Sequence, residues 1–217
     1  MKLLCLILIT PWISLAAERT ILFVDDHDIL FRAGTRRVLE KPVRHAANPL
    51  ITEDRPWEMA IGWTSVHRDK SGKYQLWYQS YAGKRAQLKT HECVVCYAES
   101  ADGITFTKPS LGLFEFNGDK NTNIVLIGSG VYGDRYCNSV IVDAKEPDAE
   151  KRYKMLYYDW AKKTKGEVIA GLHLAFSPDG IHWTKHPEAP LYATSFGGKN
   201  VPPPLTGTHP YQEATLP

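Results

Sequence analysis

The sequence has few of the features that mark several large classes of protein. It carries no apolar run long enough to span a membrane beyond its first residues, and no sustained 3.6-residue hydrophobic period apart from a weak turn near 34–40. No Gly-rich phosphate loop, Ser-His-Asp order or nucleotide fingerprint is visible. Charge is nearly balanced, with 26 Lys and Arg against 24 Asp and Glu, so nothing predicts nucleic-acid binding. At 43% hydrophobic residues, the composition argues against disorder and for a globular chain of 217 residues.

Cysteine is scarce, and its number excludes a complete disulfide framework. Of four cysteines, Cys5 lies at the apolar start, which leaves Cys93, Cys96 and Cys137. The first two have the spacing of a redox or zinc motif. They lie in a segment that reads as a strand, where residues three apart point to opposite faces, and no second pair completes a zinc site. We predict core packing for this pair and no metal or cofactor. A Cys93–Cys137 bridge stays open.

The first 17 residues have the pattern of a secretory signal peptide. A basic start at Lys2 is followed by an apolar stretch over 3–15, and Ser14-Leu15-Ala16 is a small-x-small cleavage site. We therefore expect a secreted or periplasmic protein whose mature domain covers 18–217 and does not contact a membrane after cleavage. An uncleaved membrane anchor is the alternative.

The rest of the chain contains an internal repeat. The segment KYQLWY at 73–78 resembles RYKMLYY at 152–158, and AESADGITFTK at 98–108 resembles AFSPDGIHWTK at 175–185. The order within each unit is the same. A repeat at this spacing indicates that one supersecondary module occurs twice.

Each unit is expected to form four short strands. The first copy has candidate strands at 59–68, 73–81, 92–99 and 104–108, and the second at 136–143, 152–160, 168–176 and 181–185. These runs are rich in Val, Ile, Tyr, Phe and Trp and are bounded by turn residues, with hairpin turns at 70–73 and at both Ser-x-Asp-Gly motifs. The expected fold class is all-β: a β-propeller of four-stranded antiparallel blades. A sandwich or two linked antiparallel domains is the alternative.

Four segments carry a resemblance to a known superfamily. They are LFVDD at 22–26, the stretch from Asn48 to Glu58, the strand at 74–78 with Tyr97 to Gly103, and Val142-Asp143 with Arg152 to Lys154. In this order they resemble the five-bladed β-propeller glycosidases, the superfamily of invertase-, arabinanase- and levansucrase-like enzymes. The resemblance implies about two blades, near 58–113 and 134–192, with flanking strands. Five such blades would need more than this chain, so open blade edges are expected to favour self-association.

The resemblance also directs attention to carboxylates, because glycoside hydrolysis commonly needs two of them around the scissile bond. Asp54 and Glu58 precede the innermost strand of the first unit, and Asp134 precedes that of the second. Glu99 has Phe176 as its counterpart in the other repeat, so the blade does not require a carboxylate there. The catalytic candidates are Asp54 or Asp134 as the ionised group and Glu99 as the acid. For each, a structural or solvated role is the alternative.

Candidate substrate-binding residues lie near the same rim. Trp57 and Trp63 offer aromatic planes to a sugar ring, and Arg135 offers a guanidinium group to hydroxyls or a carboxylate. Glu58 and His67 are further candidates. Asp102 and Asp179 recur in both units, so we assign them to turn architecture.

The sequence therefore predicts a glycoside hydrolase-like protein that acts on a poly- or oligosaccharide through paired carboxylates. A non-catalytic carbohydrate-binding or scaffold propeller is the main alternative. A sialidase-like enzyme ranks last, because the Ser-x-Asp-Gly-x-x-Trp box is one residue short and no arginine triad can be recognised.

Overall fold

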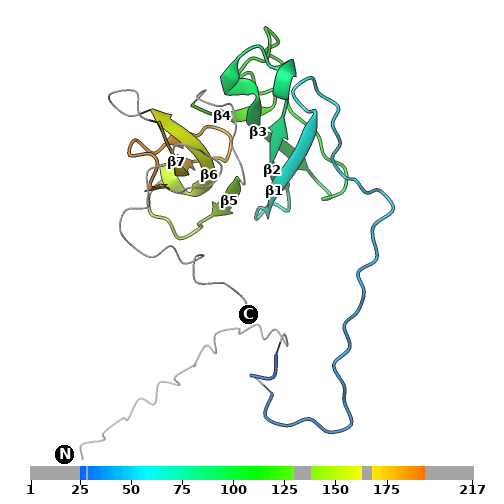
Figure 1. Ribbon diagram of the computed structural model, residues 1–217. Coiled ribbons are helices and arrows are strands. Elements are labelled where there is room, and N and C mark those ends of the chain that lie inside the picture. The colour runs from blue at the N-terminus through cyan, green and yellow to red at the C-terminus, as the bar shows by residue number, and fades with distance from the viewer. Residues whose placement is uncertain (1–24, 28, 130–137, 163–167, 194–217) are drawn as a thin grey trace, which may run out of the picture. The chain divides into compact units, whose positions relative to one another are not determined.

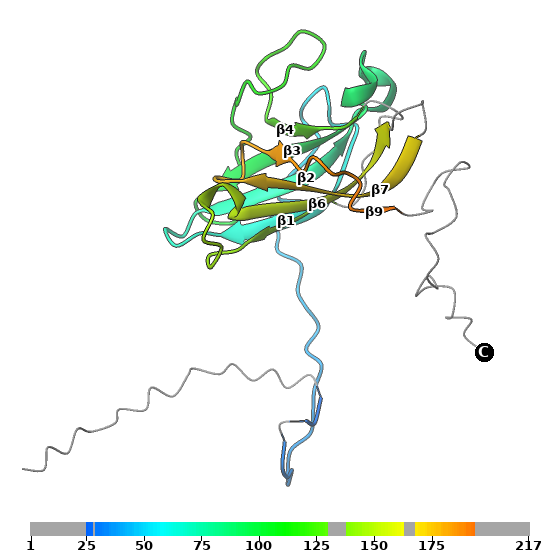
Figure 2. The ribbon, with the colours of Figure 1, turned by 90° about the vertical axis from the view of Figure 1, so that its left-hand side faces the viewer.

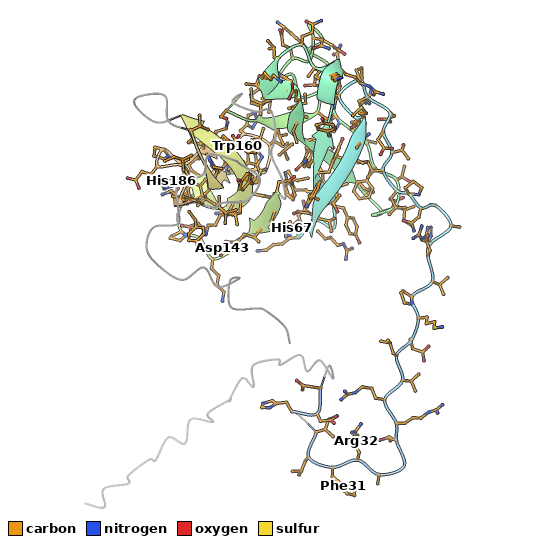
Figure 3. All side chains as sticks on the ribbon, in the orientation of Figure 1. Phe31, Arg32, His67, Asp143, Trp160 and His186 are labelled. Atoms are coloured by element: carbon orange, nitrogen blue, oxygen red, sulfur yellow. The ribbon has the colours of Figure 1, made fainter. Side chains whose placement is uncertain are left out.

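The computed structural model describes residues 25–27, 29–129, 138–162 and 168–193. Two compact parts can be distinguished, 1–44 and 45–217. In residues 1–44, the described residues form no strand. Arg32 and Arg37 both pair with Asp26, at 3.0 and 2.6 Å, and Leu30 and Phe31 are exposed (Figure 3).

Residues 45–217 contain two antiparallel sheets, one for each repeat unit (Figure 1). The first has the order β1-β2-β3-β4, with strands at Ala60–Arg68, Tyr74–Tyr81, Cys93–Ser100 and Ile124–Ile127. The second has the order β5-β6-β7-β8, at Ser139–Val142, Tyr153–Lys162, Val168–Ser177 and Thr184–Lys185, and β9 at Tyr192–Ala193 also pairs with β7. Three short 3₁₀ turns lie at Gly83–Arg85, Lys89–His91 and Ala149–Lys151. The described residues form strands and 3₁₀ turns and no α-helix, so the predicted all-β class is confirmed for this part of the chain.

Most predicted strands lie within a few residues of their observed positions, but the fourth strand of the first unit was predicted wrongly. Residues 124–127 pair with β3, whereas the predicted segment 104–108 makes only one bridge, between Thr107 and Glu99. The second unit divides its last strand in the same way, into β8 and β9. The second sheet therefore has five strands, where four were predicted.

The two sheets pack against each other through one face of each (Figure 2). Trp77 and Tyr97 of the first sheet meet Met155 and Tyr157 of the second in a shared apolar cluster. The indole Nε1 of Trp77 donates to the carbonyl of Gly180 at 2.6 Å. The strands β1 and β5 lie side by side, and the Val140 amide donates to Ser65 Oγ at 3.0 Å.

The opposite face of the first sheet is covered by the chain's own loops. A second cluster there contains Leu76, Tyr78 and Cys96 from the strands, with Trp57 and Phe116 from the covering segments. Cys93 and Cys96 are both buried, which confirms the predicted core packing, and Cys137 lies outside the described residues.

No helix among the described residues has the length and hydropathy that a membrane span requires.

Candidate functional site

The Ser-x-Asp-Gly turns confirm the structural role predicted for Asp102 and Asp179. Asp102 Oδ1 accepts from the amides of Ile104 and Thr105 at 2.8 and 2.7 Å, and Asp179 Oδ1 accepts from the two amides at the same positions of its own turn, at 2.8 Å each. The Ser hydroxyl of each turn accepts from the Asp and Gly amides. Gly103 and Gly180 have φ of +74° and +80°, a conformation that favours glycine.

The first of these turns borders an open hollow of about 670 Å³, which we call the Glu99 hollow. Its lining is mainly charged and hydroxyl-bearing: Arg68, Ser71, Gly72, Lys73, Glu99, Ser100, Ala101, Asp102, Thr105 and Thr107. The hairpin between β1 and β2 supplies one side and the end of β3 with its turn supplies the other. The hollow therefore exists because two turns of one sheet meet at the same edge.

Glu99 stands at the end of β3 and is held by two neighbours. Lys73 Nζ lies 2.5 Å from its Oε2, and the Tyr97 hydroxyl donates to the same oxygen at 3.1 Å. About a third of the Glu99 side chain is exposed. Burial, followed by the charge of Glu99, raises the pKa of Tyr97, so this hydroxyl stays protonated and can donate. The carboxylate is thus fixed in direction and still reachable from solvent.

Asp54 lines a neighbouring hollow of about 300 Å³, the Asp54 hollow. It is bordered by Leu50, Ile51, Thr52, Asp54, Arg55, Phe106, Thr107 and Lys108. Partial burial raises the pKa of Asp54, but the ammonium of Lys108, 2.6 Å away, and the guanidinium of Arg55 outweigh it and lower the pKa below its ordinary value. Thr107 borders both hollows, and its backbone pairs with Glu99. Among the described residues, Thr107 alone lines both hollows.

Glu58 serves as an anchor inside the structure. Its side chain is fully buried, and its Oε2 accepts from Lys108 Nζ at 2.7 Å and from the amides of Asp54 and Arg55 at 3.0 and 3.1 Å. Its Oε1 accepts from the Tyr78 hydroxyl at 2.6 Å. Each oxygen has a protein donor, so this carboxylate ties the covering segment to the sheet and offers no surface to a sugar.

Trp57 is likewise a core residue. It is 1% exposed, and its indole Nε1 donates to Asn123 Oδ1 at 3.1 Å. Its ring packs 5.8 Å from Phe116, between centroids. A ring that is this buried cannot stack on a substrate in the described conformation.

The other predicted residues lie on β1 or outside the described chain. Trp63 is 52% exposed and has a φ of +45°, at an irregularity in the pairing of β1 with β2. His67 is half-buried near the end of β1 (Figure 3) and pairs with Gln75, which in turn pairs with Glu99. Two strand spacings, about 10 Å, therefore separate His67 from Glu99 along one row of the sheet. Asp134 and Arg135 lie outside the described residues.

Several site residues were missed by sequence reasoning. Lys73 and Lys108 hold the two candidate carboxylates, and Arg68 borders the Glu99 hollow. Lys73 had a visible signal, because it directly precedes a strand that pairs with the strand of Glu99. Lys108 lies 54 residues from Asp54, so no local pattern connects them. Within the described ranges, no three His, Cys, Asp or Glu side chains gather in a way that could hold a metal ion.

A second polar cluster lies between the sheets, near the end where β6 finishes. Asp159 is 4% exposed, and its carboxylate accepts from the Ser129 amide at 2.9 Å and the Ser129 hydroxyl at 3.2 Å. His173, Asn138 and Gln79 are also buried. These groups line neither of the two hollows.

Comparisons with known proteins give little further information. No family model and no curated protein matches the chain. Two solved structures are similar to part of it. One is a "putative glycoside hydrolase" from Parabacteroides distasonis ATCC 8503, at 21% identity and a TM-score of 0.43 over 67% of this chain and 40% of that one. The other is an RGII complex, at 14% identity and a TM-score of 0.27 over 62% of this chain and 58% of that one. The chain thus spans less than two thirds of either structure, and overlaps of this extent establish no shared function.

Proposed function

We propose that the chain is a glycoside hydrolase-like protein that binds an oligo- or polysaccharide across the Glu99 and Asp54 hollows. The observation that carries the proposal is that two carboxylates singled out from sequence each border an open hollow, and that the hollows share Thr107. Carboxylates, ammonium groups and hydroxyls in one lining suit the many hydroxyl groups of a sugar.

The proposed chemistry uses the two carboxylates in different roles. Asp54 is the ionised partner, because Lys108 and Arg55 lower its pKa. Glu99 is the group that meets the glycosidic oxygen, as the acid of the two-carboxylate reaction. Trp63 on β1 remains a candidate aromatic plane for a sugar ring. Glu58 and Trp57, which the sequence placed among the substrate contacts, act in this proposal only by holding Asp54 and its segment in place.

The same proposal includes the fold and the location of the protein. We take the two sheets as neighbouring propeller blades. In a propeller, each blade packs one face against the next blade and the opposite face against the previous one. The two sheets fit this arrangement, because the face of β2 that carries Trp77 meets the second sheet, while Leu156, the counterpart of Trp77 in the second repeat, is 41% exposed. We also propose that residues 1–17 direct the chain to a secreted or periplasmic location. Sequencing the amino terminus of the mature protein tests the last point.

A non-catalytic carbohydrate-binding protein is the second candidate. The ion pair between Lys73 and Glu99 favours it, because a carboxylate that already accepts from an ammonium group is poorly arranged to give up a proton. Such a carboxylate still accepts hydrogen bonds from sugar hydroxyls. The two candidates share a site and differ only in turnover.

Hydrolysis and binding of a panel of nitrophenyl glycosides and oligosaccharides, measured side by side, test both candidates. For a hydrolase, Glu99→Gln and Asp54→Asn are expected to lower turnover at least about 100-fold. Glu150→Gln and Glu53→Gln, exposed carboxylates that border neither hollow, are the matched controls and should leave turnover unchanged. Binding without turnover, lost in Glu99→Gln, would establish the second candidate. Absence of both across the panel would contradict the proposed function.

A further inference from the structure

Arg68 is the one cationic group of the Glu99 hollow that has no carboxylate partner among the described residues. It ends β1, and its guanidinium carbon lies 5.4 Å from the centroid of the Tyr74 ring. Its Nε donates to the Gly72 carbonyl at 3.4 Å. Within the described part of the chain, no carboxylate lies within ion-pair distance of Arg68. The guanidinium group is therefore oriented by a ring and a carbonyl while its terminal nitrogens remain available.

The other charged groups of the hollow, Lys73, Glu99 and Asp102, already have hydrogen-bond or ion-pair partners. Glu99 is matched by Lys73 at 2.5 Å. Asp102 Oδ1 accepts hydrogen bonds from the Ser100 hydroxyl and from two amides of its own turn. These hydrogen bonds, led by the amides of Thr105 and Ile104, hold the pKa of Asp102 well below its usual range. Because Lys73 neutralises Glu99, the carboxylate that an anion approaching Arg68 still meets in the hollow is that of Asp102, whose Oδ1 accepts from its own turn.

The chemistry of the free group selects the ligand. A guanidinium group presents two parallel N–H donors that match the two oxygens of a carboxylate. Among sugars, the uronic acids carry such a carboxylate on the ring. The hydroxyls of Ser71, Thr105 and Thr107 border the same hollow and suit the remaining hydroxyl groups of such a ring.

We infer that the ligand of the Glu99 hollow is an acidic saccharide and that Arg68 binds the carboxylate of a uronic-acid residue. This inference rests on the proposed function, which supplies the saccharide, and adds the charge of the sugar and the residue that recognises it. Arg68 is thereby a specificity residue, separate from the carboxylates that would carry the reaction.

Calorimetric titration with two matched probes tests the inference: oligogalacturonates with free carboxylates, and the same oligosaccharides with methyl-esterified carboxylates. The free acid is expected to bind at least about tenfold more tightly, and this preference should weaken as salt concentration rises. Arg68→Gln is expected to abolish the preference. Arg68→Lys keeps the positive charge but loses the two parallel N–H donors. This variant should therefore retain part of the preference for the free acid, with an affinity lower by about threefold. Lys70→Gln removes the same charge from an exposed residue of the same turn that does not border the hollow, and should change affinity less than twofold.

The outcomes separate the two levels of the proposal. Glu99-dependent binding of neutral and acidic probes with equal affinity, or a preference that survives Arg68→Gln, would overturn the acidic-ligand inference and leave the proposed function standing. Binding only of sulfated oligosaccharides, run as a third arm, would also overturn it, since the carboxylate would not be the recognised group. Failure of every saccharide to bind would overturn both. A thermal melt of each variant confirms that a loss of affinity does not come from unfolding.

Discussion

The two Ser-x-Asp-Gly turns share one backbone design and have different surroundings. In the second unit, Gly180 is buried, and its carbonyl accepts from Trp77 of the first sheet. In the first unit, the equivalent Gly103 is half-buried, Asp102 is exposed, and the turn borders the Glu99 hollow. The repeat therefore determines the backbone of both turns. A ligand can bind only at the first turn, which the other sheet leaves uncovered.

Equivalent faces of the two sheets are also covered differently. Segments 45–58 and 109–123 cover the first sheet, and Glu58 fixes the first of them through Lys108 and Tyr78. The equivalent contact of the second sheet is with the first sheet itself, through Met155 and Tyr157. One repeat therefore uses a buried ion network where the other uses an apolar interface.

Removing the charge of Glu58 should have the largest effect on stability. Glu58→Gln leaves Lys108, whose side chain is 5% exposed, with only the exposed Asp54 as a charged partner. Loss of one member of a buried ion pair costs about 3–5 kcal/mol, so we expect the free energy of unfolding in urea to fall by about that amount. Glu53→Gln, in the same segment but exposed, should change it by less than about 0.5 kcal/mol. A loss below about 1 kcal/mol for Glu58→Gln would show that the network does not hold the covering segment.

A pair of glycine substitutions compares the turns directly. A Cβ at position 180 would lie 2.5 Å from Trp77 of the other sheet, while at position 103 the nearest atom, in Tyr74, would be 3.0 Å away. Both positions have positive φ, which costs any alanine about 1–2 kcal/mol. We therefore expect Gly180→Ala to destabilise the protein by about 3 kcal/mol and Gly103→Ala by about half as much, in the same urea titrations. Equal losses would argue against the tight contact between the second turn and the first sheet.

A smaller effect should appear in the pH dependence of stability. Burial raises the pKa of Asp179, but hydrogen bonds from the His182 amide and ring, the Ile181 amide and the Ser177 hydroxyl outweigh it and lower the pKa to about 2. A lowered pKa stabilises the folded state above the ordinary value of 3.8, and this stabilisation is lost as the pH falls from about 4 to about 2. Because Asp179 is 43% exposed, solvent screening reduces its share to about 1 kcal/mol.

Asp179→Asn is therefore expected to flatten the fall of stability over that interval, as followed by thermal melting at each pH. His186, a half-buried histidine outside the turn, provides a control substitution, His186→Gln, that should leave the profile unchanged. An unaltered profile in Asp179→Asn would show that the turn carboxylate contributes nothing to acid stability.

Local patterns predicted the strands and turns well, because strand and turn signals lie within a few neighbouring residues. The fourth strand of the first unit could not be found in this way. The segment at 104–108 alternates apolar and polar residues and the one at 124–127 is apolar, so each fits a strand, and only the fold decides that Val94 and Cys96 pair with the later one. The two candidate strands are separated by a loop of about fifteen residues. Nothing in the sequence of either strand indicates whether this loop comes before or after the fourth strand.

Site prediction reached the carboxylates but not their partners. The sequence singles out Glu99 through its contrast with Phe176, and the structure shows Glu99 bordering a hollow. It could not reveal that Glu58 is matched by Lys108, 50 residues later, or that Trp57 donates to Asn123, 66 residues later. Charge and aromaticity make these two residues resemble substrate contacts, whereas burial with distant partners makes them part of the core.

Hydrogen exchange of the backbone amides, measured by mass spectrometry with and without the best-binding saccharide of the panel, tests the central claim most directly. The account predicts protection in peptides covering 68–73 and 99–108, with the equivalent turn at 177–183 unchanged. Protection centred instead on 60–67 and 139–142, or equal protection of both turns, would contradict a saccharide site at the uncovered turn of the first sheet.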